Sequence, residues 1–181
     1  MSRIEDLDYV TMSPEQKKIA DEIIASRGKV AGPFIPWLRS ADLADRSQKL
    51  GAYCRYETSL PPRLSELAIL ILARDWTIQM EWHAHKPIAL EAGTDPDVID
   101  AIAERKTPKF KNKDEEVIYN FSTELLKNKK VSANIYAATI AELGEAALVD
   151  LIAILGYYSS VAMVLNTFEI LPSDGIKPLS E

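Results

Sequence analysis

Both histidines of the chain, His83 and His85, lie in one short stretch, EWHAHKP, which begins at Glu81 and ends at Pro87. In a helix, Glu81 and His85 stand one turn apart on the same face, where the carboxylate can fix the tautomer of the imidazole. His83 is two residues from both and points to another face. A zinc motif on one helix places its two histidines four residues apart. The two-residue spacing, with no cysteine nearby, therefore predicts no metal, and it leaves an acid–base pair and an ordinary pair on a helix surface as the alternatives.

The same pair is also compatible with an ordinary solvent-exposed contact, which stabilises a helix by roughly a few tenths of a kcal/mol. Two neighbouring features favour a pocket wall instead. Trp82 and the apolar residues around it indicate a largely buried helix, in which ionisable groups need partners. Pro87 cannot donate a hydrogen bond to the carbonyl of His83, so we expect the helix to kink or to be interrupted near His85.

Glu66 is a further candidate, because it stands beside the apolar run LAILILA, three residues after Arg63. As a first-turn glutamate it could simply favour the helix dipole. In one continuous helix Glu66 would lie about 28 Å from His85, at about 1.5 Å per residue. A shared site therefore requires the chain to turn back near the sequence RDWT, residues 74–77, which permits such a turn without requiring it. Arg63 could offer its charge to a substrate carboxylate or pair with Glu66.

The elements that must position these residues are all helical, because no stretch alternates with the period of a strand. Ser13, Pro14 and Gln16 form the pattern of a capping box, and Gly28 is a plausible helix stop. The sequence predicts an all-α single domain of roughly eight helices. We expect the first helix from Pro14, a short one after the prolines at 33 and 36, one over 41–56 and one from about 63. The next should run from Asp75 or Thr77 to 93, another from 94–96, and another over 113–127. The last part should run from a Ser132 cap to Gly144 and from there to about 168.

Composition excludes several functions. The net charge of −6 and pI near 5.1 argue against a nucleic-acid partner and against binding to an anionic membrane. The N-terminus has no signal-like apolar segment, and we interpret the apolar stretch 151–168 as a core or subunit-interface helix rather than a membrane span. Cys54 is the only cysteine, so it cannot form an internal disulfide, and packing is its expected role. We expect a cytoplasmic protein.

Three segments together resemble the carboxymuconolactone decarboxylase family, which has the AhpD-like all-helical fold. They are LPPRLSELAILILARDWTIQMEWHAHKPIALEAGTDPDVIDAI, the upstream GPFIPWLRSADLADRSQKLGAYCRYETSLP and the downstream ILGYYSSVAMVLNTFEI. The motif is a glutamate after an arginine, followed by Glu-Trp-x-x-His. The resemblance implies that Glu66, Glu81 and His85 meet in one pocket. It also implies a core at about 41–170, with residues 1–40 as a helical extension that could reshape or cover the pocket.

The peroxidase branch of this superfamily carries a CxxC before the histidine, where this chain has Ile78 and Glu81. The resemblance therefore implies the decarboxylase-like branch, which uses neither metal nor organic cofactor. It suggests a small carboxylated lactone or enol-type substrate, with His85 as acid and base, Glu81 orienting it and Glu66 as a second proton relay. Arg63, Trp82 and His83 are the expected substrate contacts, and a homotrimer or homohexamer is the expected assembly.

Two alternatives stay open. The chain could be a non-catalytic homo-oligomer that binds a small ligand, an interpretation that Glu66 and His85 lying far apart would favour. Peroxide reduction would have to use Cys54 alone.

Overall fold

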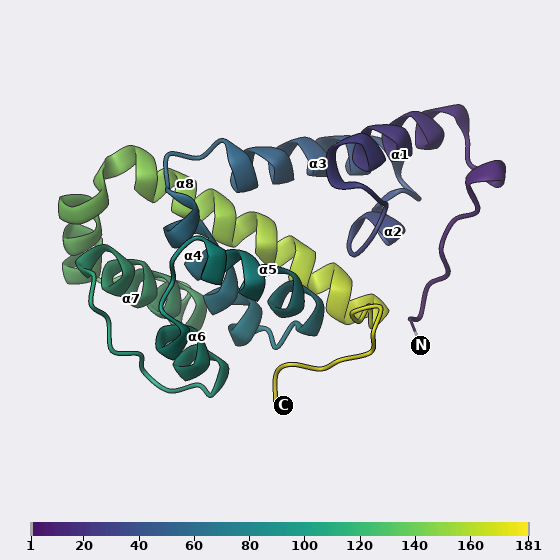
Figure 1. Ribbon diagram of the computed structural model, residues 1–181. Helices are drawn as coiled ribbons and strands as arrows, with labels where there is room; N and C mark the ends of the chain where they lie inside the picture. Colours follow the sequence, from purple (N-terminus) through teal and green to yellow (C-terminus); the bar gives the residue numbers. More distant parts are fainter. Residues whose placement is uncertain (1, 181) are drawn as a thin grey trace.

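Helices form all of the regular structure in residues 2–180, the part of the chain that the computed structural model describes (Figure 1). Over this range there are eight α-helices, a short 3-10 turn at Tyr9–Thr11 and no strand, so the predicted all-α fold is confirmed. The helices are α1 (Pro14–Arg27), α2 (Phe34–Trp37), α3 (Ala41–Tyr56), α4 (Pro62–Asp75), α5 (Gln79–Glu91), α6 (Pro96–Ala103), α7 (Lys113–Asn128) and α8 (Ala133–Phe168).

Several helix ends lie where the sequence predicts them. The Ser13 hydroxyl accepts a hydrogen bond from the Gln16 amide, and the Gln16 side chain accepts one from the Ser13 amide, which completes the capping box of α1. The helix ends at Gly28, whose φ of 82° is left-handed. Gly144, with φ 80°, interrupts α8, so the expected break before the apolar helix is present. Ser132 precedes α8, but its side chain makes no capping hydrogen bond.

The start of α5 differs from the prediction. Neither Asp75 nor Thr77 caps this helix; the residue before its first turn is Ile78, which offers no side-chain hydrogen bond. Asp75 is the last residue of α4, and Thr77 has a φ of 52° and belongs to the connecting turn. The Thr77 hydroxyl instead accepts hydrogen bonds from the guanidinium groups of Arg74 and Arg105. This turn reverses the chain between α4 and α5.

The helix α5 runs through Pro87 to Glu91, so it is not interrupted near His85. The missing proline amide leaves the carbonyl of His83 without its helical donor. Water can reach this part of the helix, because 44% of the His83 side chain is exposed. The helix therefore tolerates the proline.

The helix α4 lies at the centre of the molecule. In Figure 1, α8 runs diagonally, with α1, α2 and α3 on one side of it and α4 to α7 on the other. The neighbours of α4 are α5, α6, α7 and α8, and every α4 residue from Leu64 to Arg74 is buried. Glu66 lies within this segment, so its carboxylate must find partners inside the protein.

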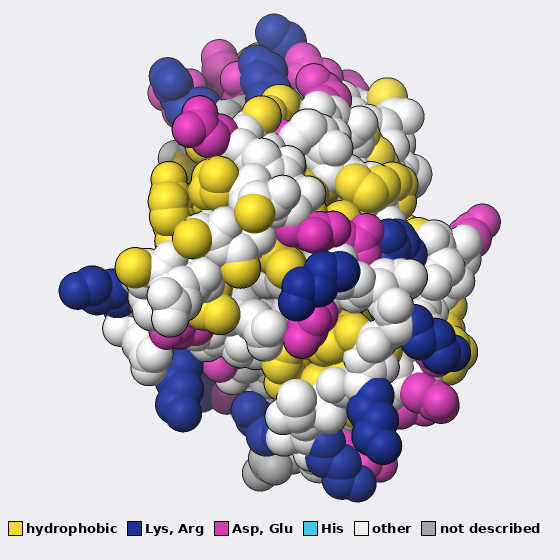
Figure 2. Space-filling model, turned by 90° about the vertical axis from the view of Figure 1, so that its left-hand side faces the viewer, with side chains coloured by type: hydrophobic (Ala, Val, Ile, Leu, Met, Phe, Trp, Pro, Cys, Tyr) yellow, Lys and Arg dark blue, Asp and Glu magenta, His cyan; other side chains and the backbone are white. Residues whose placement is uncertain are grey.

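The helix α8 combines a buried side with exposed apolar residues. By length and composition alone it could cross a membrane, the one helix in residues 2–180 of which this is true. Core helices pass the same test, and α8 packs on α3, α4 and α7, with 56% of its most apolar 18-residue window buried. Val149, Ile152 and Met163 are exposed. The face drawn in Figure 2 shows charges of both signs among hydrophobic side chains, without a continuous basic surface.

Candidate functional site

The turn between α4 and α5 brings Glu66 and His85 together, although 19 residues separate them. The amide of Ile78 bonds to the carbonyl of Ala73, which closes the turn, and α5 then packs back along α4. As a result, Nδ1 of His85 lies 2.6 Å from Oε2 of Glu66. The sequence permits this reversal, and the structure contains it.

Glu81 contacts the opposite edge of the same imidazole. Its Oε2 lies 3.2 Å from Nε2 of His85, across the expected single turn of α5. The imidazole therefore lies between two carboxylates, and the ring of Tyr158 packs edge-on against it, with centroids 5.2 Å apart. All three members are buried: Glu66 and His85 are each 3% exposed and Glu81 is 7% exposed. We call Glu66, His85 and Glu81 the Glu–His–Glu triad.

The triad keeps its imidazole protonated. Burial by itself lowers the pKa of His85, because it disfavours the charged ring. Hydrogen bonds with Glu66 and Glu81, and the charges of these carboxylates, outweigh burial and raise the pKa from 6.5 to about 9. At neutral pH the ring therefore carries a proton on each nitrogen, and each N–H points to a carboxylate. This is a stored proton next to two acceptors.

The triad does not have the arrangement of a metal site. The two carboxylates lie on opposite edges of the imidazole, at Nδ1 and at Nε2, and so do not converge on one point with a ring nitrogen. Within residues 2–180, no group of three or more His, Cys, Asp or Glu side chains could hold a metal ion. The geometry fits proton transfer instead.

A cavity of about 310 Å³ opens beside the triad. Its size is at the lower end of the roughly 300–1,000 Å³ that is usual for small-molecule sites. Both Glu81 and His85 line it, whereas Glu66 lies behind the imidazole. The remaining wall combines segments from both ends of the chain with α3, α5 and α8: Arg27, Lys29, Ala31, Gly32, Pro33, Phe34, Gly51, Arg55, Met80, His83, Ala84, Tyr157, Tyr158, Val161, Pro172 and Ser173. Part of the predicted N-terminal extension thus forms a wall of the site.

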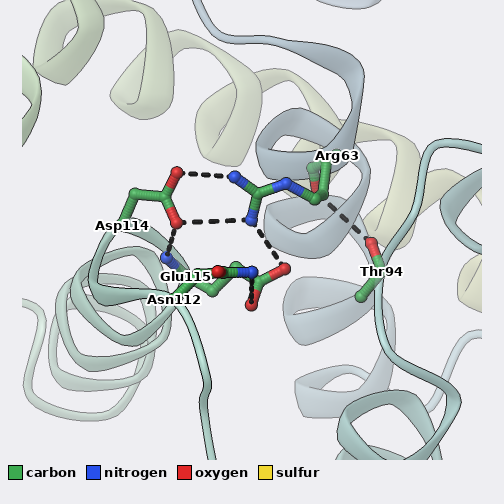
Figure 3. A network of polar contacts seen from close by, with 5 residues as sticks. All are labelled: Arg63, Thr94, Asn112, Asp114 and Glu115. Carbon is green, nitrogen blue, oxygen red and sulfur yellow. Dashed lines mark hydrogen bonds and ion pairs between the residues drawn. The ribbon is translucent and has the colours of Figure 1, made fainter.

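Two of the three expected substrate contacts lie outside the cavity. Trp82 is 1% exposed and packs in the core, on a different face of α5. Arg63 does not pair with Glu66 and does not line the cavity. Its guanidinium lies 2.6 Å from Asp114 and 2.6 Å from Glu115 on α7 (Figure 3). These acidic residues at the start of α7 neutralise the arginine there, so the expected contact of Arg63 with a substrate carboxylate finds no support.

His83 does line the cavity, but at its exposed rim. Its Nε2 lies 3.7 Å from Asp174 of the C-terminal segment, a distance that makes a weak contact at most. It stands two residues from both Glu81 and His85 and is not a member of the triad. Its predicted role as a lesser contributor to the pocket stays a prediction.

Sequence reasoning missed the other polar residues of the wall. Arg27, Lys29 and Arg55 give it positive charge, and Tyr157 and Tyr158 give it two phenol rings. Two adjacent tyrosines within the apolar run ILGYYSSVAMV could have pointed to the site, because the rest of this run has no aromatic side chain with a polar group. Nothing in the local sequence links the arginines and the lysine to α5.

Cys54 is fully buried, with no exposed surface, and is not bonded to another cysteine. Burial raises the pKa of its thiol to about 11, so the nucleophilic thiolate is rare at neutral pH. These properties fit the predicted packing role and argue against peroxide reduction by this thiol alone.

Comparisons with known proteins identify the fold. No protein-family model matches the chain, and no curated protein matches it in sequence. Among solved structures, an uncharacterised peroxidase-related protein with an alkylhydroperoxidase AhpD core, from Ralstonia eutropha JMP134, superposes with a TM-score of 0.78 at 15% identity, over 96% of this chain and 93% of that one. An uncharacterised peroxidase-related protein from Silicibacter sp. TM1040 gives 0.75 at 12% identity, over 93% and 91%. The chain therefore has the AhpD-like helical fold. Identities this low show the fold alone.

Proposed function

We propose that the protein is a cofactor-independent lyase that removes carbon dioxide from a small carboxylated lactone or enol-type substrate. The observation that carries this proposal is a buried imidazole held between two carboxylates in the wall of a cavity. The resemblance of residues 30–170 to the carboxymuconolactone decarboxylase family suggests the reaction. The solved structures with this fold support only the fold.

In the proposed reaction, the electron pair of the bond to the carboxylate moves into a conjugated carbonyl as carbon dioxide departs. The carbon that lost the carboxylate then needs a proton, which His85 supplies from its Nε2 side. Glu81 contacts this nitrogen at 3.2 Å and also faces the cavity, so it can hold or relay the proton. Glu66, at 2.6 Å from Nδ1, keeps the ring oriented and charged. Solvent then returns a proton to the imidazole, and no metal or organic cofactor takes part.

The cavity supports a small anionic substrate. Three of its wall residues, Arg27, Lys29 and Arg55, are cationic, and Phe34 with the two tyrosines offers flat apolar surface. Long-range attraction to the cations would draw in a carboxylated molecule. The volume of about 310 Å³ suits a single small ring.

The proposal is tested by screening carboxylated lactones for release of carbon dioxide, beginning with 4-carboxymuconolactone. His85→Gln and Glu81→Gln should each lower kcat by about 100-fold or more, because general acid catalysis contributes about 10²–10⁴-fold. Glu91→Gln makes the same change as Glu81→Gln on the exposed side of α5 and should keep full activity. Full activity of His85→Gln, with an unchanged circular dichroism spectrum, would show that the acid–base assignment is wrong.

The second candidate is a non-catalytic homo-oligomer that binds a small ligand. Exposed apolar residues on α8 favour self-association: Val149 is 65% exposed, Met163 54% and Ile152 48%. A trimer or hexamer formed through this helix is compatible with both candidates. A large separation of Glu66 from His85 would have favoured the non-catalytic one, and their 2.6 Å contact favours the lyase.

A further inference from the structure

The hydroxyl of Tyr157 lies directly against the backbone of α3. A methyl group built on Gly51 would come within 2.6 Å of Cζ of Tyr157 and closer still to its hydroxyl oxygen. Only a residue without a side chain permits this approach. Gly51 and Tyr157 both line the cavity, so the phenol is fixed in the wall at the point where α3 crosses α8.

Arg55 lies one turn beyond Gly51 on the same face of α3, and it also lines the cavity. It is half-buried, and no carboxylate in residues 2–180 lies within ion-pair distance of its guanidinium. Against the effect of burial, which raises the pKa of both Tyr157 and Tyr158, the charge of Arg55 lowers each pKa, and the charge of Arg27 lowers the pKa of Tyr157 more strongly. The guanidinium packs over the ring of Tyr56, with its Cζ 5.3 Å from the ring centroid, and makes no ion pair, so it retains hydrogen-bond donors at the cavity wall.

The two tyrosines connect this cationic side of the cavity to the triad. Their rings pack edge-on against each other, 5.2 Å apart, and Tyr158 packs in the same way against His85. Burial raises the pKa of both tyrosines, so each keeps its O–H and can donate a hydrogen bond. One cavity therefore holds a proton donor, the triad, and a separate pair of hydrogen-bond donors, Arg55 and Tyr157.

We propose that Arg55 and the hydroxyl of Tyr157 form an oxyanion-binding site. The proposal extends the lyase function and rests on it for the identity of the oxyanion. When the bond to the departing carboxylate breaks, its electron pair makes the conjugated carbonyl oxygen an enolate. Arg55 and Tyr157 donate hydrogen bonds to this oxygen while carbon dioxide leaves. Once the triad has protonated the carbon, the carbonyl re-forms and the oxygen loses its charge. Donors fixed in a cavity wall favour the charged oxygen over the neutral carbonyl.

The test is the ionisation of a bound probe, 4-nitrophenol, whose phenolate mimics an enolate oxygen and absorbs at a wavelength distinct from that of the phenol. In the unmodified protein we expect the phenolate to bind at least about tenfold more tightly than the phenol, which lowers the pKa of the bound probe by about one unit or more. Arg55→Gln should weaken this preference most, Tyr157→Phe should weaken it less, and Arg55→Lys should keep most of it. Arg46→Gln removes the same charge from an exposed position of α3 outside the cavity and should change nothing.

An unshifted pKa of the bound probe, an equal shift in Arg55→Gln, or a failure of the probe to bind at millimolar concentration would each overturn the oxyanion site. Circular dichroism of every variant excludes misfolding as the cause. The assay involves no turnover, so its result is independent of the lyase assay. A lowered probe pKa in a protein that decarboxylates no lactone leaves the oxyanion site intact and removes the lyase. If turnover is lost in His85→Gln but the pKa of the bound probe is unshifted, the lyase function stands and the oxyanion site is removed.

Discussion

Replacing His85 should change how the stability of the protein depends on pH. Folding raises the pKa of His85 from 6.5 to about 9, so the folded state holds a proton that the unfolded state has lost. The resulting stabilisation is fully present below pH 6.5 and disappears as the pH rises through about 9. At 1.36 kcal/mol for each pKa unit, the difference corresponds to roughly 3 kcal/mol. Domains have free energies of unfolding of about 5–15 kcal/mol, so this change is large enough to measure.

Urea unfolding of the unmodified protein, at about pH 6 and about pH 10, should therefore show a loss of roughly 3 kcal/mol from this group. In His85→Gln this part of the loss should be absent. Burial also raises the pKa of Cys54, but its effect at high pH is common to both proteins and cancels in the difference. His83→Gln makes the same substitution two residues away, on an exposed side chain, and should retain the full loss.

An NMR titration gives the direct measurement, because the chain has only two histidines. One imidazole should titrate near pH 9. A pKa at or below 6.5 for His85, or an equal loss of stability in His85→Gln and the unmodified protein, would refute the argument that the two carboxylates outweigh burial.

Two further predictions concern packing. Gly51→Ala should lower the free energy of unfolding by about 1–2 kcal/mol in urea, because the added methyl group overpacks the ring of Tyr157. As a control, Gly156→Ala places its methyl where no neighbouring atom lies within 4 Å, so it should be neutral or stabilising in the same assay. Equal effects of the two substitutions would contradict the close approach of Tyr157 to Gly51. Ile152→Glu on α8 should convert the proposed trimer or hexamer to monomers in sedimentation velocity, and a wild-type protein that is already monomeric would remove the assembly proposal.

The sequence predicts the elements well, because local signals decide most of them. The capping box at Ser13 and the stops at Gly28 and Gly144 depend only on nearby backbone and side chains. The predicted start of α5 was wrong because the conformation of Thr77 depends on Arg105, which lies 28 residues away and donates a hydrogen bond to the threonine hydroxyl. A local pattern does not contain that contact.

The candidate site divides in the same way. The pair of Glu81 and His85 follows from helix periodicity, since one turn of α5 joins them. The partnership of Glu66 with His85 depends on the reversal between α4 and α5, and for this the family resemblance was needed. Arg55 and Tyr157 could not be assigned to the site from the sequence, because they line one cavity only where α3 packs against α8.

The central position of α4 has a consequence for how its neighbour is aligned. Glu66 is surrounded by apolar residues on a helix with no exposed side over Leu64–Arg74. If α5 slid along α4 by one turn, about 5.4 Å, the apolar contacts could largely re-form, but this carboxylate would lose the imidazole and remain buried without a counter-charge. A broken buried pair costs about 3–5 kcal/mol, so the misaligned arrangement is strongly disfavoured. The residues proposed for catalysis therefore also select a single register between α4 and α5, whose other contacts are apolar.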